Sequence, residues 1–254
     1  MGEETTIAWT HRTFNPWMGC MKVSPGCAHC YAEELVTRRF KRPLWGPAAT
    51  TARARTSPAN WKQPIRWNAE VAAGRSTRHL VFCASLADVF EDHPALAPWR
   101  ADLFELMRST PSLIWQVLTK RPENIARMLP ADWGGGYFNV WLGTSIEDEW
   151  VTHRADHLRE IPAAVRFISY EPALGPLDEL DLTGIDWLIY GGESGPHFRP
   201  DDDDWLAKAI LKCADSGTAF FLKQRAARRP GVISDTGLAL RRFPALYTGE
   251  VSDG

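Results

Sequence analysis

Three of the chain's five cysteines, Cys20, Cys27 and Cys30, lie close together in the spacing C-x6-C-x2-C. Glycine and proline residues beside and between them predict a loop of constrained backbone geometry, and we expect a helix from residue 31 to about residue 42. Three thiolates from one loop leave a metal centre one protein ligand short. A structural zinc ion normally takes four protein ligands, whereas an iron–sulfur cube can leave one iron open for a substrate or cofactor. The spacing therefore points to metal chemistry at this loop.

The composition is that of a chain with a sizeable core, because 44% of its 254 residues are hydrophobic and 24% are charged. A formal net charge of −2 argues against a strongly basic nucleic-acid binder, although a local basic patch is compatible with it. The first residues are acidic and polar, and no apolar run reaches the roughly 18 residues of a membrane helix. We therefore predict no membrane association and a cytoplasmic location. An odd number of cysteines without an export signal favours reduced thiols.

Short apolar runs alternate with amphipathic stretches along most of the chain. The predicted strands are one run between residues 5 and 15 and further runs at 79–84, 113–118, 139–143, 165–169, 187–190 and 219–222. The predicted helices cover 95–109, 122–129, 147–160 and 204–216, with Gly217 as the expected stop of the last one.

Apolar strands that alternate with helices indicate a parallel sheet that is buried on both faces. We predict an α/β fold, a partial (β/α)6-type TIM barrel of parallel strands with helices outside and the cysteine loop after the first strand. The chain is expected to form a single domain over 1–254, with an insertion rich in Pro, Arg and Trp around 43–78 that folds into helical pieces and loop.

Polar or ionisable residues follow every predicted strand, and in a parallel barrel the carboxyl ends of the strands gather on the face where active sites are built. The cysteine loop follows the first strand, so we expect it to open onto the same face. The candidate catalytic residues at these ends are Glu171, Glu193 and Lys120. The candidate cofactor-binding residues are Ser85, Asp88, Thr119, Ser145, Gly191, Gly192, Lys223 and Gln224.

Simpler roles remain open for several of these residues. Ser85, Asp88 and Thr144 could each only cap a helix. Glu171 could be the structural partner of Lys120 or Arg121. The remaining cysteines lie in an apolar strand and a helix, and both are predicted core residues: Cys83 and Cys213.

The cysteine spacing, with the His29 ring just before the last cysteine, resembles the signature of the radical S-adenosylmethionine (SAM) superfamily, which is commonly C-x3-C-x2-C. The wider chain resembles a phage-associated, largely uncharacterised three-cysteine family. That resemblance rests on segments 15–20 (NPWMGC), 22–27 (KVSPGC), 30–33 (CYAE), 116–122 (QVLTKRP), 169–176 (SYEPALGP), 191–196 (GGESGP), 199–200 (RP) and 220–224 (FFLKQ). Segments 30–32 (CYA), 85–88 (SLAD) and 118–120 (LTK) are more weakly similar to the spore photoproduct lyase branch of radical SAM enzymes.

The resemblance implies a partial barrel in which Cys20, Cys27 and Cys30 hold a 4Fe–4S cluster, with SAM on the fourth iron. Reductive cleavage of SAM would give a 5′-deoxyadenosyl radical that abstracts hydrogen from the substrate, with the electron supplied by a flavodoxin or ferredoxin type of donor. The superfamily usually places a Gly-Gly-Glu motif after the second strand, where it meets the SAM amino group. Here the motif at 191–193 follows the sixth predicted strand, so Ser85 and Asp88 take the second-strand position instead.

Two alternatives belong to other functional classes. A zinc-stabilised binding module would add His29 or His11 to the three cysteines. A metal-independent hydrolase would use Glu171 and Glu193 as a carboxylate pair.

The predicted substrate class is a nucleic acid or nucleotide, with a small molecule or peptide left open. Two basic segments, 38–42 and 223–229, are candidates to flank the mouth and bind phosphate, although a solvated surface explains them equally well. The acidic run at 201–204 is expected to start a helix, where carboxylates suit the helix dipole.

Overall fold

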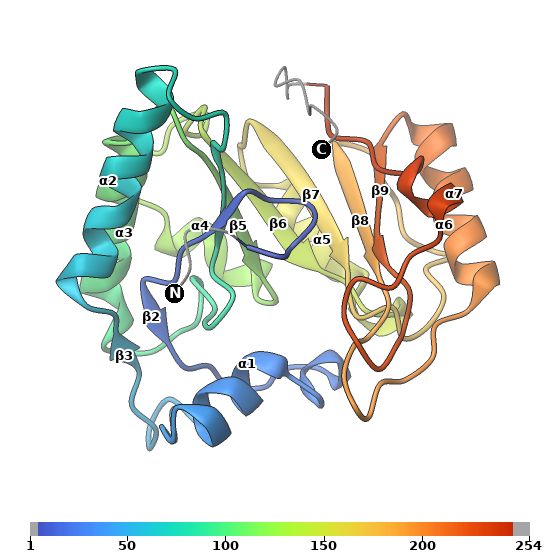
Figure 1. Ribbon diagram of the computed structural model, residues 1–254, viewed down its shortest axis with the longest axis horizontal. Helices are drawn as coiled ribbons and strands as arrows, with labels where there is room; N and C mark the ends of the chain where they lie inside the picture. Colours follow the sequence, from blue (N-terminus) through green and yellow to red (C-terminus); the bar gives the residue numbers. More distant parts are fainter. Residues whose placement is uncertain (1–4, 246–254) are drawn as a thin grey trace.

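The computed structural model describes residues 5–245, and its centre is a seven-stranded parallel sheet with the order β1-β4-β5-β6-β7-β8-β9. The strands are β1 (Arg12–Thr13), β4 (Leu80–Cys83), β5 (Ile114–Thr119), β6 (Val140–Ser145), β7 (Val165–Tyr170), β8 (Trp187–Gly191) and β9 (Ala219–Gln224). Spatial order follows chain order, and the sheet curls into a half-barrel (Figure 1). The predicted partial TIM barrel is therefore confirmed, with seven strands in its sheet.

Helices cover the convex side of the sheet. They are α2 (Pro58–Ala72), α3 (Leu96–Arg108), α4 (Ile125–Met128), α5 (His153–Arg159), α6 (Asp203–Ser216) and α7 (Asp235–Leu238). The predicted helix boundaries hold for α3 and α6, and Gly217 ends α6 in the left-handed conformation with φ of 73°. The acidic run starts α6 as expected, since the Asp202 side chain accepts from the Asp204 backbone N–H.

Alternation along each strand sends side chains to two different cores. On β4, Val81 and Cys83 join the helix-side core, whereas Leu80 and Phe82 join a second core on the concave side. The convex core also contains Cys213 of α6, which confirms the prediction that Cys83 and Cys213 are both core residues. Because both faces of the strands are apolar, the sequence shows continuous apolar runs rather than alternation.

The amino-terminal half of the concave side is closed by aromatic rings. Trp9, from the segment that precedes β1, packs 4.6 Å from Phe82 and 6.2 Å from both Phe167 and Trp187, measured between ring centroids. Gly143 makes room for this cluster, since a Cβ atom there would lie 2.4 Å from the Phe167 ring. The interior of the half-barrel is thus filled with aromatic rings near its base.

The segment from β1 to β4 carries the cysteine loop and an antiparallel pair. The pair joins β2 (Trp17–Met18) to β3 (Ala54–Arg55), and the predicted helix after the loop is shorter than expected. Helix α1 (Tyr31–Glu34) continues as one π-helical turn over Leu35–Arg39 and then stops before Lys41, whose φ of 54° is left-handed. Figure 1 shows α1 lying across the carboxyl ends of the strands, at the bottom of the view.

The predicted insertion at 43–78 contains one long helix, α2, rather than several pieces. Ser57 caps its start by accepting a hydrogen bond from the Asn60 backbone N–H, and Trp67 anchors it in the convex core. In the described part of the chain, no helix combines the length and apolarity needed to cross a membrane.

His11 lies at the opposite end of the sheet from the cysteine loop, where its Nδ1 accepts a hydrogen bond from the Leu80 backbone N–H at 3.1 Å. Burial, followed by the charges of His79, Arg78 and Arg12, lowers the pKa of His11 from 6.5 to about 4. The unfolded chain therefore binds this proton at higher pH than the folded chain. Neutral His11 therefore contributes its full amount to the free energy of unfolding above about pH 6.5. This contribution decreases as the pH falls and levels off below about pH 4.

We predict that His11→Asn removes this component of the pH dependence, because the amide oxygen can replace Nδ1 as acceptor without titrating. Urea unfolding of both proteins between pH 8 and pH 4, taken at about one-unit steps, measures it. As the pH falls through this window, the folding equilibrium constant of the wild type should decrease by up to about tenfold more per pH unit than that of the variant. Parallel curves for the two proteins would contradict the assignment.

Candidate functional site

The concave wall of the half-barrel changes from apolar to charged toward the carboxyl ends of the strands. In β6 and β7, Trp141 and Phe167 on this face give way to Ser145 and Ser169, which are register partners. Beyond them lies a rim of charged side chains, namely Lys120, Glu147, Glu171 and Lys223. The wall becomes polar here because each strand ends and continues into a loop. The polar groups therefore gather at the carboxyl ends of the strands, where parallel barrels usually carry their active sites.

The cysteine loop is held over this rim by contacts with residues from four different strand ends, three of them made by side chains and one by a backbone carbonyl. The anchors are the Ser85 carbonyl after β4, Arg121 after β5, Glu147 after β6, and Glu193 with Arg199 after β8. The predicted position of the loop on the carboxyl face of the sheet is therefore confirmed. Because the anchors span most of the sheet, the loop is positioned by the barrel as a whole and not by its own short helix.

Glu147 is the most enclosed anchor, with a side chain that is 1% exposed. Its carboxylate accepts hydrogen bonds from Lys120 at 2.9 Å, Arg154 at 2.8 Å and the Ser24 hydroxyl at 2.9 Å. Burial alone would raise the pKa of Glu147, but the two cations and these hydrogen bonds hold it below its usual value. Glu147 thus remains ionised and ties the cysteine loop to β6.

Glu193 forms the second anchor, in the glycine-rich turn after β8. Arg199 reaches it with both ends of its guanidinium, at 2.5 and 2.9 Å, and donates to the Pro25 carbonyl at 3.2 Å. His29 lies 3.1 Å from the same carboxylate. Burial opposes ionisation of Glu193, yet the bonds from Arg199 and His29 lower its pKa. The carboxylate therefore joins the turn to the cysteine loop on its far side.

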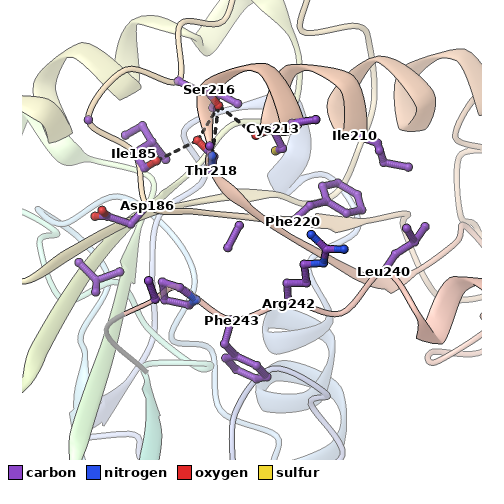
Figure 2. A pocket seen from close by; sticks show the side chains of 18 residues that line it. Ile185, Asp186, Ile210, Cys213, Ser216, Thr218, Phe220, Leu240, Arg242 and Phe243 are labelled. Atoms are coloured by element: carbon purple, nitrogen blue, oxygen red, sulfur yellow. Dashed lines mark hydrogen bonds between the residues drawn. The ribbon is translucent and has the colours of Figure 1, made fainter. Parts of the chain in front are cut away.

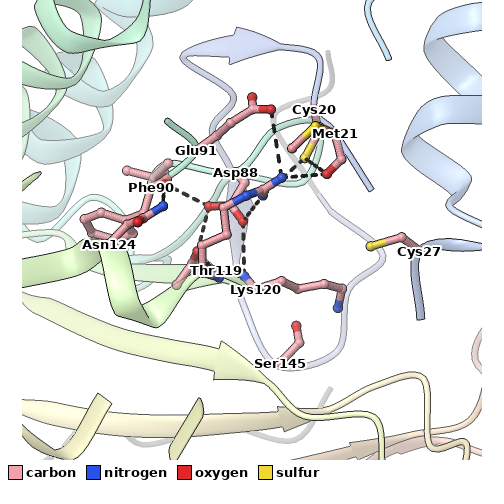
Figure 3. A network of polar contacts seen from close by, with 12 residues as sticks. Cys20, Met21, Cys27, Asp88, Phe90, Glu91, Thr119, Lys120, Asn124 and Ser145 are labelled. Atoms are coloured by element: carbon pink, nitrogen blue, oxygen red, sulfur yellow. Dashed lines mark hydrogen bonds and ion pairs between the residues drawn. The ribbon is translucent and has the colours of Figure 1, made fainter. Parts of the chain in front are cut away.

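The third anchor is an ion pair between Arg121 and Asp88 at 2.7 Å, with both side chains nearly buried (Figure 3). Arg121 also donates to the Met21 carbonyl at 2.6 Å and to the Cys20 sulfur at 3.6 Å. Asp88 in turn accepts from the Thr119 hydroxyl at 2.6 Å and from the Phe90 N–H at 2.9 Å. These contacts connect the first thiol of the motif directly to β4 and β5.

All three cysteines are free and only partly buried. Burial is the main cause that raises the pKa of Cys20, to about 12, and nearby Asp88 adds to it while Arg121 opposes it. Burial likewise raises the pKa of Cys30. Bound metal cations would offset this cost and hold the sulfurs as thiolates, so the donor set fits a thiolate-ligated group.

Within residues 5–245, no three His, Cys, Asp or Glu side chains come close enough to surround a single metal ion. An iron–sulfur cube binds each thiolate through a different iron, and its ligands do not converge on one point. The histidines proposed for a zinc site have other partners, since His29 contacts Glu193 and His11 contacts Leu80 at the far end of the sheet. Among the described residues, neither histidine lies with the cysteines in a group that could surround one metal ion.

The remaining predicted residues divide into exposed and supporting ones. The ion partner of Glu171 is Lys223, and not Lys120 or Arg121 as considered from the sequence. The side chains of Glu171 and Lys223 are each about one-fifth exposed. Gln224 is buried and donates to the Gly192 carbonyl, while Gly192 lies against Ala226, where a Cβ would meet backbone at 2.0 Å. Gly191 lies beside Glu171.

The two predicted SAM contacts that follow β4, Ser85 and Asp88, also have local partners. The Ser85 hydroxyl lies 3.0 Å from Asn15, and the Ser85 carbonyl accepts from the Tyr31 hydroxyl at 3.0 Å. The Gly-Gly-Glu motif follows β8, which is the sixth strand of the sheet, so its unusual topological position is confirmed. Glu171 and Glu193 have separate cationic partners, Lys223 and Arg199, rather than forming a carboxylate pair.

A separate hollow of about 800 Å³ lies at the amino ends of β8 and β9, away from the cysteine loop, and Cys213 is among its lining residues (Figure 2). Its polar side chains serve local structure, because Thr218 donates to the Ile185 carbonyl and Asp186 accepts from the Arg166 N–H. It holds none of the predicted site residues.

A protein-family model described as "Protein of unknown function (DUF5131)" matches residues 4–238. The chain belongs to this family. The match covers the cysteine loop, every strand of the sheet and all anchors of the loop. No curated protein and no solved structure matches the chain.

Four residues that build the site were not among the predicted candidates: Arg121, Glu147, Arg154 and Arg199. The three arginines each form an ion pair with a nearly buried carboxylate, and Glu147 is the carboxylate partner of Arg154. The sequence carried a signal for two of them, because Arg121 and Glu147 stand within a few residues of strands whose other end residues were selected. Arg154 lies on a helix and Arg199 in a loop, and their partners are set by folding.

We predict that Gly26→Ala destabilises the cysteine loop, because its Cβ would lie 2.5 Å from the Glu147 carboxylate. That carboxylate cannot move away without losing bonds to Lys120, Arg154 or Ser24. The expected cost is about 1–3 kcal/mol of unfolding free energy, measured by denaturant titration.

Gly135→Ala is the matched control, since a Cβ at Gly135 meets nothing within 4 Å. It should change the unfolding free energy by less than about 0.5 kcal/mol. Equal stability of the two variants would show that Glu147 is not held as tightly as its contacts indicate.

Proposed function

We propose that this chain is a radical SAM-type enzyme in which Cys20, Cys27 and Cys30 hold a 4Fe–4S cluster. The observation that carries the proposal is a loop of three free thiols, anchored over the charged mouth of a half-barrel. The resemblance of the cysteine motif to the superfamily signature supports the same chemistry. When bound, such a cluster and SAM supply an electron and a cleavable carbon–sulfur bond, from which a 5′-deoxyadenosyl radical arises.

The residues of the chain supply binding and exclusion of water. The aromatic cluster around Trp9 closes the base of the half-barrel, so that a ligand reaches the concave wall only from the mouth. At the mouth, Ser145 and Ser169 offer hydroxyls, and Lys120 and Lys223 offer cations that are about one-fifth exposed. Together they provide hydrogen bonds and charge for SAM and substrate next to the thiols.

The proposed substrate class is a nucleotide or nucleic acid, following the resemblance to the phage-associated family and to photoproduct lyases. Lys120 and Lys223 are suited to phosphate, although both are paired with glutamates in this structure. Glu171, paired with Lys223, is the proposed catalytic carboxylate nearest the concave wall. The proposed electron donor is a protein of the flavodoxin or ferredoxin type.

Anaerobic reconstitution with iron and sulfide tests the proposal. We expect a brown protein with about four irons per chain, which releases 5′-deoxyadenosine from SAM when a strong reductant is added. Cys20→Ala should lose most of the iron and all of the SAM cleavage. Cys213→Ala is the matched control, because Cys213 lies in the convex core, and it should keep both.

A colourless wild-type protein that retains about one zinc per chain would contradict the proposal and support the zinc alternative. Equal iron contents for Cys20→Ala and Cys213→Ala would also contradict it, because the iron would then be bound elsewhere.

A further inference from the structure

Arg121 is a cation in direct contact with the cysteine motif. Its Nη1 atom lies 3.6 Å from the Cys20 sulfur and 2.7 Å from Asp88, and its Nη2 atom lies 2.6 Å from the Met21 carbonyl. The guanidinium therefore contacts both the Cys20 thiol and the Asp88 carboxylate, and Glu91 lies 3.9 Å from it. Only about 6% of this side chain is exposed, so its charge acts in a medium that screens it weakly.

Asp88 holds Arg121 in this position and has little capacity left for a ligand. Its Oδ1 accepts from the Thr119 hydroxyl and the Phe90 N–H, and its Oδ2 accepts from the Lys120 N–H and Arg121. An ionised carboxylate has about four acceptor positions, and all of them are in use. The structure therefore favours a supporting role for Asp88 over the direct SAM contact expected from its place after β4.

Glu91 adds to the network without competing for Arg121. Its carboxylate pairs with Arg53 through two hydrogen bonds, at 2.7 and 2.8 Å, and lies 3.9 Å from Arg121. Arg53 also donates to backbone carbonyls of residues 44–52. Because Arg53 largely satisfies Glu91, Arg121 keeps its donors for Asp88, Met21 and the thiol.

We propose that Arg121 is a positioning residue that raises the reduction potential of the cluster bound through Cys20, and that Asp88 moderates this effect. The inference rests on the proposed cluster. Hydrogen bonds to cluster sulfurs and nearby net charge are two of the terms that set the potential of an iron–sulfur centre. A donated N–H and a buried positive charge both stabilise the reduced form, which carries one more electron.

The proposal makes opposite predictions for the two members of the ion pair. Arg121→Gln removes the positive charge, so the midpoint potential should shift to more negative values. Asp88→Asn removes the neighbouring negative charge while an amide oxygen remains to accept from Arg121, so the potential should shift to more positive values. Arg121→Lys keeps a charge but loses the planar fork, and its potential should lie between those of the wild type and Arg121→Gln.

Arg154→Gln is the matched control. Its side chain is also about 6% exposed and pairs with a buried carboxylate at the same rim, Glu147, but it donates to the Ser145 carbonyl where Arg121 donates to a cysteine sulfur. Loss of this charge should shift the potential less than loss of Arg121 does.

Spectroelectrochemical titration of each reconstituted protein measures the midpoint potential, with iron content and thermal unfolding recorded in parallel. If Arg121→Gln fails to assemble a cluster, Arg121→Lys and Asp88→Asn decide the question, since their expected shifts have opposite signs. Equal potentials for Arg121→Gln and Arg154→Gln, or shifts of Arg121→Lys and Asp88→Asn in the same direction, would overturn the role of Arg121.

A wild-type protein that binds no cluster would overturn the proposed function and this inference together. If the wild-type protein binds about four irons but its midpoint potential does not change when Arg121 is replaced, only the inference would be overturned.

Discussion

Buried charges at the carboxyl ends of the strands must find partners, and this requirement sets the position of the cysteine loop. Arg121, Glu147 and Glu193 are each almost enclosed, and each contacts both an ion partner and the cysteine loop, through Met21, Ser24 and His29 respectively. An uncompensated charge at any of these positions would cost several kcal/mol on an order-of-magnitude basis, because it would be left in a weakly screening interior. The loop is therefore held by electrostatics from three different strands, while its own segment supplies one helical turn and a π-turn.

The half-barrel is divided along its axis by the chemistry of its concave wall. At the base, aromatic rings around Trp9 exclude water, and Gly143 gives them space. At the mouth, serines and charged pairs replace the rings. The two zones have one cause, since each strand passes from the middle of the sheet, where only apolar side chains are stable, to a loop, where polar ones are solvated or paired. The polar zone of the wall therefore lies on the same side of the sheet as the thiols.

The ion pairs at the mouth do not all serve the same purpose. The carboxylate oxygens of Asp88 and Glu147 accept hydrogen bonds from other residues of the protein, so these two residues support the site and do not offer free oxygens to a ligand. Lys223 and Glu171 are paired but partly exposed, and Ser145 and Ser169 lie on the same wall. This division places the candidates for direct contact on β6, β7 and β9, and it assigns the ends of β4 and β5 mainly to support of the first cysteine. The proposed radical chemistry and the proposed tuning by Arg121 both follow from this arrangement.

The sequence alone determined the sheet, its parallel strands and the place of the cysteine loop, because apolar runs and strand-end polar residues are local signals that survive in any tertiary context. It also located the buried cysteines, the start of α6 and its glycine stop. Only the tertiary structure decided which charges pair: Lys223 with Glu171, Arg199 with Glu193, Arg154 with Glu147. The partners in these pairs are 52, 6 and 7 residues apart in the sequence, and the curvature of the barrel and the paths of the loops bring them together. The sequence shows that charges of both signs are present, but it does not give the distances between them. For the same reason, Asp88 was recognisable as a strand-end carboxylate, but its commitment to Arg121 depended on the fold.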